Sequence, residues 1–297
     1  EQTALRASAG TANPLLSLTE ARNRRFVLPA DYIPSVPKEP GTDRALFFTI
    51  SQLHPYLNWK AFFHTWKIGG NFASIADVQG CDHCKAGWLA SFPEKERGKA
   101  AEAMQLYKEA LRMLDEWERK NITAKAVFGL YESVSTPEAI RIRHQGKTTD
   151  IPCLRQQTIK DEPEAVCYAL NDFILPETTG RNDYIGIFAV TAGTETEEIN
   201  LYYRDRGDDY RALLLASLTD RLAEAGAEYL HYLIRTRYWG YENEKEHTSR
   251  SLLSQKYRGI RPAVGYPSLP DQSLGFVLAE ILDYKKAGIQ LTENGAM

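Results

Sequence analysis

The stretch Tyr257–Asp271 carries residue types suited to binding a small polar ligand. Its two glycines and three prolines rule out a helix or a central strand and indicate a stiff, pinned loop. Glycines let a ligand approach the backbone, whose amides can then bond to it. Arg261 offers a planar guanidinium suited to a carboxylate, and Tyr266 offers an aromatic face with a hydroxyl. A proline-rich surface crossing between two helices explains the pattern equally well.

A row of acidic residues follows one side of a long predicted helix, Asp208–Tyr238. Asp220, Glu224 and Glu228 recur at four-residue steps, apart from the apolar side of the helix. Like charges at this spacing repel one another on a bare helix. The row is therefore either a binding surface or a solvated stripe relieved by neighbouring arginines, and the pattern leaves both interpretations open.

Cys81 and Cys84 form a Cys-x-x-Cys pair with a histidine between them. A structural zinc site would require a second pair of ligands, and the other cysteines, Cys153 and Cys167, are distant in the sequence. The spacing also fits a redox pair, but no strand is predicted before it as in thioredoxin-like folds. We interpret the two as incidental thiols, with metal binding as the second interpretation.

Composition narrows the class of protein. The chain has 297 residues, of which 43% are hydrophobic and 25% charged, as in ordinary globular proteins. A net charge of −3 and a pI near 6.1 provide no basic surface, so we expect neither nucleic acid nor membrane as a partner. No apolar run approaches the roughly 20 residues that span a bilayer, and the first residues lack a signal-peptide layout. Four cysteines in a chain of this length indicate a reducing cytoplasm.

The order of the predicted elements indicates an α+β fold. Strands are expected in the middle of the chain and helices towards its two ends, which is not the alternation of a parallel α/β fold. Residues 1–17 are expected to form a flexible arm or linker, and 18–297 a single domain. The expected helices are Leu57–Trp66, 98–119, Asp208–Tyr238 and Phe276–Lys286. The expected strands are Ala124–Tyr131, Ala139–Arg143, Val166–Ile174 and Tyr184–Thr191.

Several short motifs occur in a fixed order along the chain. They are Leu57–Trp66, Leu154–Thr158 (Leu-Arg-Gln-Gln-Thr), Asp183–Thr191 (beginning Asp-Tyr-Ile-Gly), Asp220–Ala225, Tyr238–Tyr241 (Tyr-Trp-Gly-Tyr), Arg261–Tyr266 and Leu291–Glu293. In this order they resemble the C-terminal activation domain of cobalamin-dependent methionine synthase, whose signature Arg-x-x-x-Gly-Tyr is matched by Arg261–Tyr266. The resemblance implies a bent domain with a twisted antiparallel sheet flanked by helices. It also implies that 18–297 lack the last C-terminal segment of the family.

The resemblance implies an S-adenosylmethionine site on the loop. Arg261 is expected to hold the methionyl carboxylate, and Ala263, Gly265 and Tyr266 to serve the adenosine part, largely through backbone atoms. Glu224 is expected to line the methionyl or ribose end.

Two further positions follow from the resemblance. Asn58 stands where the family usually has an aspartate of the ligand site, so it keeps an acceptor oxygen without the charge. Asp220 is expected on the surface that docks the cobalamin module.

The implied function is reactivation of methionine synthase by reductive methylation of cob(II)alamin to methylcobalamin. The implied partners are a cobalamin-binding module, fused or separate, and a flavodoxin-like electron donor. No Asp-x-His-x-x-Gly cobalamin motif occurs in the chain, so cobalamin is expected on the partner module. No metal ligand and no catalytic residue is assigned.

The chain alone is not expected to make methionine, although it would belong to a 5-methyltetrahydrofolate–homocysteine methyltransferase. The alternative is a non-catalytic interaction module that keeps the fold but has lost S-adenosylmethionine binding. Asn58 and the early C-terminus favour this alternative, whereas Arg261, Gly265, Tyr266 and Glu224 oppose it.

Overall fold

The computed structural model describes residues 15–41, 43–158 and 165–295. Most of the predicted arm at 1–17 lies outside the described residues. Its last residues lead into helix α2 (Leu18–Asn23), where Ser17 and Glu20 form a reciprocal capping box. No helix in the described ranges combines the length and apolar character that crossing a membrane requires.

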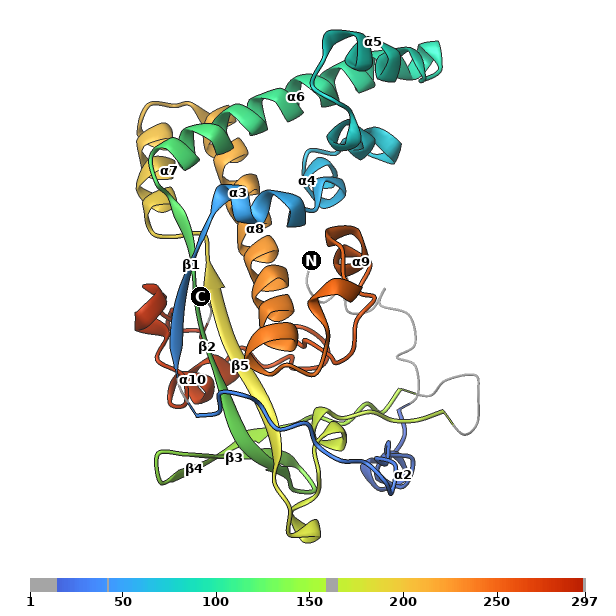
Figure 1. Cartoon of the computed structure of the whole chain (residues 1–297), viewed down its shortest axis with the longest axis vertical. Coiled ribbons are helices and arrows are strands. Elements are labelled where there is room, and N and C mark those ends of the chain that lie inside the picture. The colour runs from blue at the N-terminus through green and yellow to red at the C-terminus, as the bar shows by residue number, and fades with distance from the viewer. Residues whose placement is uncertain (1–14, 42, 159–164, 296–297) are drawn as a thin grey trace, which may run out of the picture.

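The centre of the molecule is an open antiparallel sheet built around one long strand (Figure 1). This strand, β2 (Thr123–Ser135), pairs with β5 (Asp183–Thr191) along one edge. On its other edge it pairs first with β1 (Arg44–Thr49) and then with β3 (Ala139–His144). β3 continues through a tight turn into β4 (Lys147–Pro152). The predicted α+β class with an antiparallel sheet is confirmed.

Alternation along β2 divides the interior into two hydrophobic clusters. Phe128 and Leu130 belong to the larger one, which the helices cover. Val127 and Tyr131 belong to the smaller one, on the opposite side of β2. Even-numbered and odd-numbered residues of β2 therefore belong to two different cores, one on each face of the sheet.

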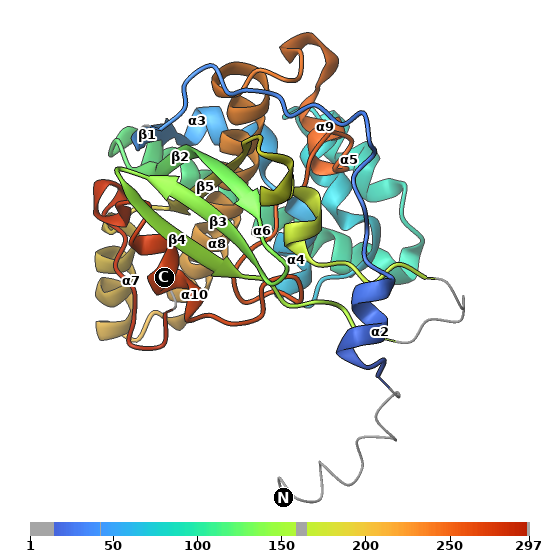
Figure 2. The same cartoon turned by 90° about the horizontal axis from the view of Figure 1, so that it is seen from below.

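Most helices pack against the larger core. They are α3 (Ile50–Leu53), α4 (Trp59–Thr65), α5 (Asp82–Ala90), α6 (Glu94–Arg119), α7 (Glu195–Asp205) and α8 (Asp209–Leu233). Helix α9 (Ser249–Leu253) lies beside α8. Helix α10 (Leu274–Ala279) lies with the C-terminal segment against the other face, as Figure 2 shows from below. Shorter 3-10 turns are η1 (His54–Tyr56), η2 (Gly70–Asp77), η3 (Leu170–Phe173), η4 (Glu177–Thr179), η6 (Glu244–Glu246) and η7 (Tyr284–Ala287).

The strand predicted at Val166–Ile174 was wrong. Within the described residues this segment pairs with no strand, and it turns into η3 instead. Asp172 explains the turn, because its carboxylate accepts the backbone N–H of Ala169 at 3.0 Å and both guanidinium nitrogens of Arg155 at 2.7 Å. The apolar residues of this segment therefore indicate that it is buried, and not that it pairs with a strand of the sheet.

The helix predicted at Phe276–Lys286 was too long. Helix α10 ends at Ala279, and η7 begins only at Tyr284. Asp283 lies between them and accepts the backbone N–H of Lys285 at 3.1 Å, which starts a new turn. Strands β1 and β4 and helices α5 and α7 had not been predicted.

Candidate functional site

Helix α8 supplies one wall of the candidate site, and its C-terminal end is irregular. After Leu233 the chain continues as a π-helical turn, Ile234–Tyr238, and stops at Gly240, whose φ is +83°. A π turn inserts an extra residue per turn and is frequent at functional sites. Arg235 lies in this turn with its side chain fully buried.

The loop Tyr257–Asp271 has neither helix nor regular strand, as predicted. It is tightened by a small turn in which Gly265 N donates to Leu269 O and Leu269 N donates to Tyr266 O, each at 2.8 Å. Gly265 has a φ of +87°, a conformation that a side chain would strain. Tyr266 leaves 63% of its surface exposed, so its ring is open to a ligand or to solvent.

Arg261 joins this loop to α8. Its Nη2 donates to Oε2 of Glu228 at 2.9 Å, and their side chains are 23% and 8% exposed. A largely desolvated pair of this kind holds the guanidinium in one orientation. The acidic row on α8 is therefore not an inert stripe at this position.

The pair leaves two charged atoms without a partner. Nη1 of Arg261 and Oε1 of Glu228 are both buried and make no hydrogen bond within the described part of the chain. A buried polar atom without a partner costs free energy, so native structures supply one, from protein, water or ligand. A ligand that carries both a carboxylate and an ammonium group would complement these two atoms.

The other predicted site residues have more solvated positions. Glu224 and Asp220 lie on the exposed side of α8, and Glu224 accepts Nη1 of Arg221 at 2.8 Å. Ala263 is exposed on the loop between Arg261 and Gly265.

Asn58 caps a helix. Its Oδ1 accepts the backbone N–H of Ala61 at 3.0 Å at the start of α4. It lies just after Tyr56, whose ring packs 5.0 Å from that of Tyr229, the residue after Glu228 on α8. The structure thus brings Asn58 to the same stretch of α8, but no hydrogen bond joins it to Arg261 in the described residues.

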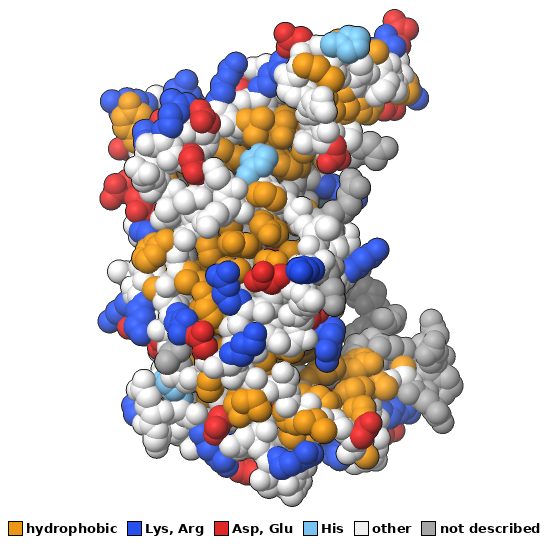
Figure 3. All heavy atoms as spheres, viewed as in Figure 1, with side chains coloured by type: hydrophobic (Ala, Val, Ile, Leu, Met, Phe, Trp, Pro, Cys, Tyr) orange, Lys and Arg blue, Asp and Glu red, His pale blue; other side chains and the backbone are white. Residues whose placement is uncertain are grey.

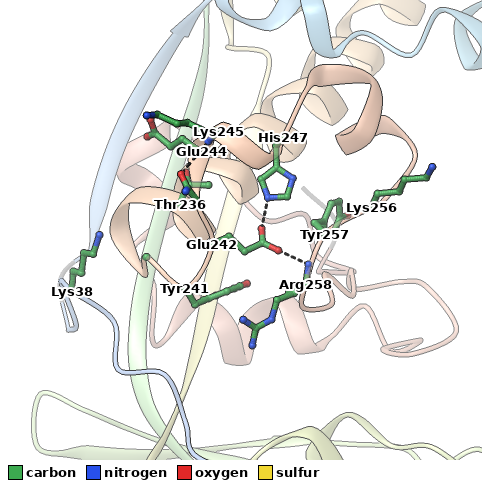
Figure 4. A pocket seen from close by; sticks show the side chains of 12 residues that line it. Lys38, Thr236, Tyr241, Glu242, Glu244, Lys245, His247, Lys256, Tyr257 and Arg258 are labelled. Atoms are coloured by element: carbon green, nitrogen blue, oxygen red, sulfur yellow. Dashed lines mark hydrogen bonds and ion pairs between the residues drawn. The ribbon is translucent and has the colours of Figure 1, made fainter.

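A second network anchors the base of the loop. The carboxylate of Glu242 accepts Nε of Arg235 at 2.7 Å and the backbone N–H of Arg258. Nε2 of His247 lies 3.0 Å from the same carboxylate, and Figure 4 shows His247 and the backbone of Arg258 on either side of Glu242. Burial acts to raise the pKa of Glu242, but the N–H of Arg258 and the guanidinium of Arg235 outweigh it and lower the pKa. An ionised Glu242 therefore ties the π turn to the start of the loop.

His231 lies near both Arg235, which is buried, and Arg261, which is partly buried. Burial, followed by the charges of Arg235 and Arg261, lowers its pKa to about 3. Its Nδ1 is 2.8 Å from Nη1 of Arg235 and must accept, because arginine stays protonated. His231 is consequently neutral near pH 7 and carries its proton on Nε2.

A hollow of about 970 Å³ opens beside the base of the loop (Figure 4). Its walls include Lys38, Tyr241, His247 and Tyr257, but neither Arg261 nor Glu224 lines it. Charges of both signs are interspersed over the face of the molecule shown in Figure 3. The Arg261–Glu228 pair, and not this hollow, therefore has the functional groups expected of the ligand site.

Two comparisons with known proteins bear on this geometry. Residues 49–297 match the family model described as vitamin B12 dependent methionine synthase, activation domain. The chain belongs to this family. A solved structure of the MetH reactivation domain bound to AdoHcy is 32% identical, with a TM-score of 0.79. The match covers 94% of this chain and 82% of that one.

Sequence reasoning about this activation domain missed Glu228, Arg235 and Glu242 as parts of the site. Glu228 stood in the acidic row, but its spacing did not show that it faces Arg261. Arg235 was one of the neighbouring arginines, with Arg221, that could relieve that row, and Glu242 follows Tyr241 without a motif of its own. The sequence therefore held no local signal that these three residues are buried together near the loop.

Proposed function

We propose that this chain binds S-adenosylmethionine and supports reactivation of methionine synthase, in which cob(II)alamin is reductively methylated to methylcobalamin. Three findings support the proposal: membership of the activation-domain family, the likeness to a reactivation domain bound to AdoHcy, and the Arg261–Glu228 pair. The pair carries the most weight because it is a property of this chain's own side chains.

The unpaired atoms of that pair fit the amino-acid end of the ligand. Nη1 of Arg261 offers a charged donor to a carboxylate, and Oε1 of Glu228 offers a charged acceptor to an ammonium group. Glu228 holds Arg261 by its other nitrogen, so the guanidinium is oriented before a ligand arrives. Preorganisation of this kind reduces the entropy lost on binding.

The loop serves the rest of the ligand. The backbone around Ala263 and Gly265 is exposed, and the ring of Tyr266 can cover an adenosine. Glu224 would line the methionyl or ribose end from the exposed side of α8. Asn58 contributes less in this proposal, because its side chain is uncharged and its carbonyl oxygen already accepts one hydrogen bond as the cap of α4.

When bound, S-adenosylmethionine supplies the methyl group for the reaction. The residues of this chain hold and orient the ligand, which converts an encounter between two molecules into an aligned approach. Asp220, exposed on α8, belongs to the surface that would dock the cobalamin-binding module.

The partners are a cobalamin-binding module, fused or separate, and a flavodoxin-like electron donor. The reaction belongs to the methyltransferase as a whole, with cobalamin carried by the partner module. The four cysteines are free thiols, in keeping with a reducing cytoplasm.

Calorimetry with S-adenosylmethionine tests the proposal. Arg261→Ala should weaken binding by about 2 kcal/mol, because a charge-assisted bond to the carboxylate is lost. Arg258→Ala is the matched control, since it removes a positive charge from the same loop while Arg258 contacts Glu242 through its backbone only. No heat from the unmodified chain would overturn the proposal and favour an interaction module that has lost the ligand.

A further inference from the structure

The first turn of α5 places two thiols together at a distance from the Arg261 loop. In Figure 1, α5 lies at the far end of α6, away from α9 and the segment that follows it. Cys81 is the N-cap residue of α5 and Cys84 is three residues further on. Residues at this spacing lie on the same side of a helical turn. The chain therefore has a close pair of thiols that the ligand site does not use.

The two thiols differ in exposure and in hydrogen bonding. Cys81 is exposed, and its Sγ accepts the backbone N–H of Cys84 at 3.2 Å. Cys84 is partly buried. By contrast, Cys153 and Cys167 are buried in the domain. Only the first pair is open to a reagent from solvent.

These contacts divide the pair into a nucleophile and a second thiol. Hydrogen bonds from the side chain and backbone of Cys84 lower the pKa of Cys81, whereas the same side-chain contact raises the pKa of Cys84. Cysteines at helix N-termini and in Cys-x-x-Cys motifs are the ones that exchange disulfides readily. The arrangement has an exposed attacking sulfur and a neighbouring resolving sulfur.

We propose that Cys81 and Cys84 form a redox-active dithiol, which a small disulfide oxidises to an intramolecular disulfide. The thiolate of Cys81 attacks one sulfur of the disulfide RSSR, which forms a mixed disulfide and releases one thiolate, RS⁻. Cys84 then loses its proton and attacks the Sγ of Cys81, which releases the second RS⁻. Two protein thiols are oxidised, RSSR is reduced to two thiols, and no other oxidant is required.

A metal site explains this arrangement less well. A structural zinc ion takes four ligands in a tetrahedron, and two thiolates supply half of them. In the described residues, no third histidine, cysteine or carboxylate joins the pair to complete a metal-binding group. A disulfide requires only the two sulfurs that are present.

Glutathione disulfide is the probe for the test, with intact-protein mass spectrometry as the readout. The unmodified chain should lose two hydrogens and gain no stable adduct. Cys84→Ser should instead trap one glutathione on Cys81, because the resolving thiol is gone. Cys81→Ser should react at least about tenfold more slowly, because the thiol with the lowered pKa is missing. Cys153→Ser is the control and should behave like the unmodified chain.

The proposal would be overturned by a stable glutathione adduct on the unmodified chain, by no adduct on Cys84→Ser, or by equal rates for the two single variants. Stoichiometric zinc that protects both thiols from a maleimide would also overturn it. Both positions lie at an exposed helix end, so circular dichroism should show native helix content for both variants. Oxidation should leave S-adenosylmethionine binding unchanged, which separates this test from that of the proposed function.

Discussion

The proposed role of Arg261 in ligand binding should depend on Glu228. An arginine on a loop of glycines and prolines could adopt many rotamers, and fixing them on binding reduces affinity. The 2.9 Å bond to Glu228 holds Nη2, whereas Nη1 has no partner among the described residues. The same residue that orients Arg261 also supplies a carboxylate oxygen beside it. Glu228 is thus a positioning residue for Arg261 as well as a proposed contact.

Glu228→Gln tests this dependence, because it keeps the shape of the side chain and removes its charge. We expect S-adenosylmethionine binding to weaken by about 1–3 kcal/mol, the range for a lost hydrogen bond to a charged group. In the Arg261→Ala background, Glu228→Gln should weaken S-adenosylmethionine binding by less than it does in the unmodified chain. The difference between these two effects, the coupling free energy, should be about 0.5–3 kcal/mol. Additive effects, measured by calorimetry with the four proteins, would show that the two residues act independently.

The sequence predicted Arg261 but not its partner. Arg261 stands in a motif whose spacing can be read directly, together with Gly265 and Tyr266. Its contact with Glu228 depends on how a loop 33 positions away folds back onto α8. The distance between two such segments is set by the packing of the whole chain and has no local pattern. Residue types therefore predicted the chemistry, and only tertiary structure assigned the partners.

At the level of elements, the end of α8 is the part that positions the site. Its π turn directs Arg235 inwards, where the side chain reaches Glu242 on the segment that follows. The guanidinium also lies 3.9 Å from the ring centroid of Tyr257, the first residue of the loop. The buried guanidinium of Arg235 therefore links the end of α8 to both the segment that carries Glu242 and the start of the loop. His231 accepts a hydrogen bond from Arg235 only while it is neutral, so acid should disrupt this contact.

Protonation of His231 should destabilise the fold at low pH. Its pKa of about 3 in the folded chain lies below the ordinary value of 6.5, so the unfolded chain binds a proton first as the pH falls. The resulting stability is complete above pH 6.5 and is lost progressively between pH 6.5 and 3. From pH 7 to 5.5 the loss should be about 1 kcal/mol.

Urea unfolding of the chain and of His231→Gln at these two pH values measures this loss. The glutamine keeps an acceptor for Arg235 but does not titrate, so its stability should fall about 1 kcal/mol less over the interval. Equal losses in both proteins would show that His231 is not the group responsible.

Element prediction succeeded where the pattern was long and failed where it was short. The 98–119 periodicity indicated α6, and the apolar run at Tyr184–Thr191 indicated β5. Strand β1 was missed because Arg44–Thr49 follows a proline-rich segment and takes its register from β2. The π turn also escaped prediction, since its residues continue the helical pattern of α8 without a break. Both β1 and the π turn depend on contacts with distant parts of the chain, which a local sequence pattern does not show.

At the level of the whole molecule, one sheet connects two hydrophobic cores, and only the larger of them contains tryptophan side chains. All five tryptophans lie in or against the larger core: Trp59, Trp66, Trp88, Trp117 and Trp239. The smaller core contains none of them and includes Ile142 of β3, which is 1% exposed. Tryptophan fluorescence therefore follows the helical side of the sheet, whereas circular dichroism follows both sides.

This separation allows a test of whether the sheet unfolds as one unit. Ile142→Ala removes buried volume from the smaller core and should lower the free energy of unfolding by about 2–5 kcal/mol. β2 contributes side chains to both cores, so damage on one face should be transmitted to the other through its backbone pairing. The fluorescence midpoint in urea should then fall together with the circular dichroism midpoint, although no tryptophan contacts the smaller core. An unchanged fluorescence midpoint with an earlier dichroism phase would mean that the C-terminal side unfolds separately from the core that carries α8.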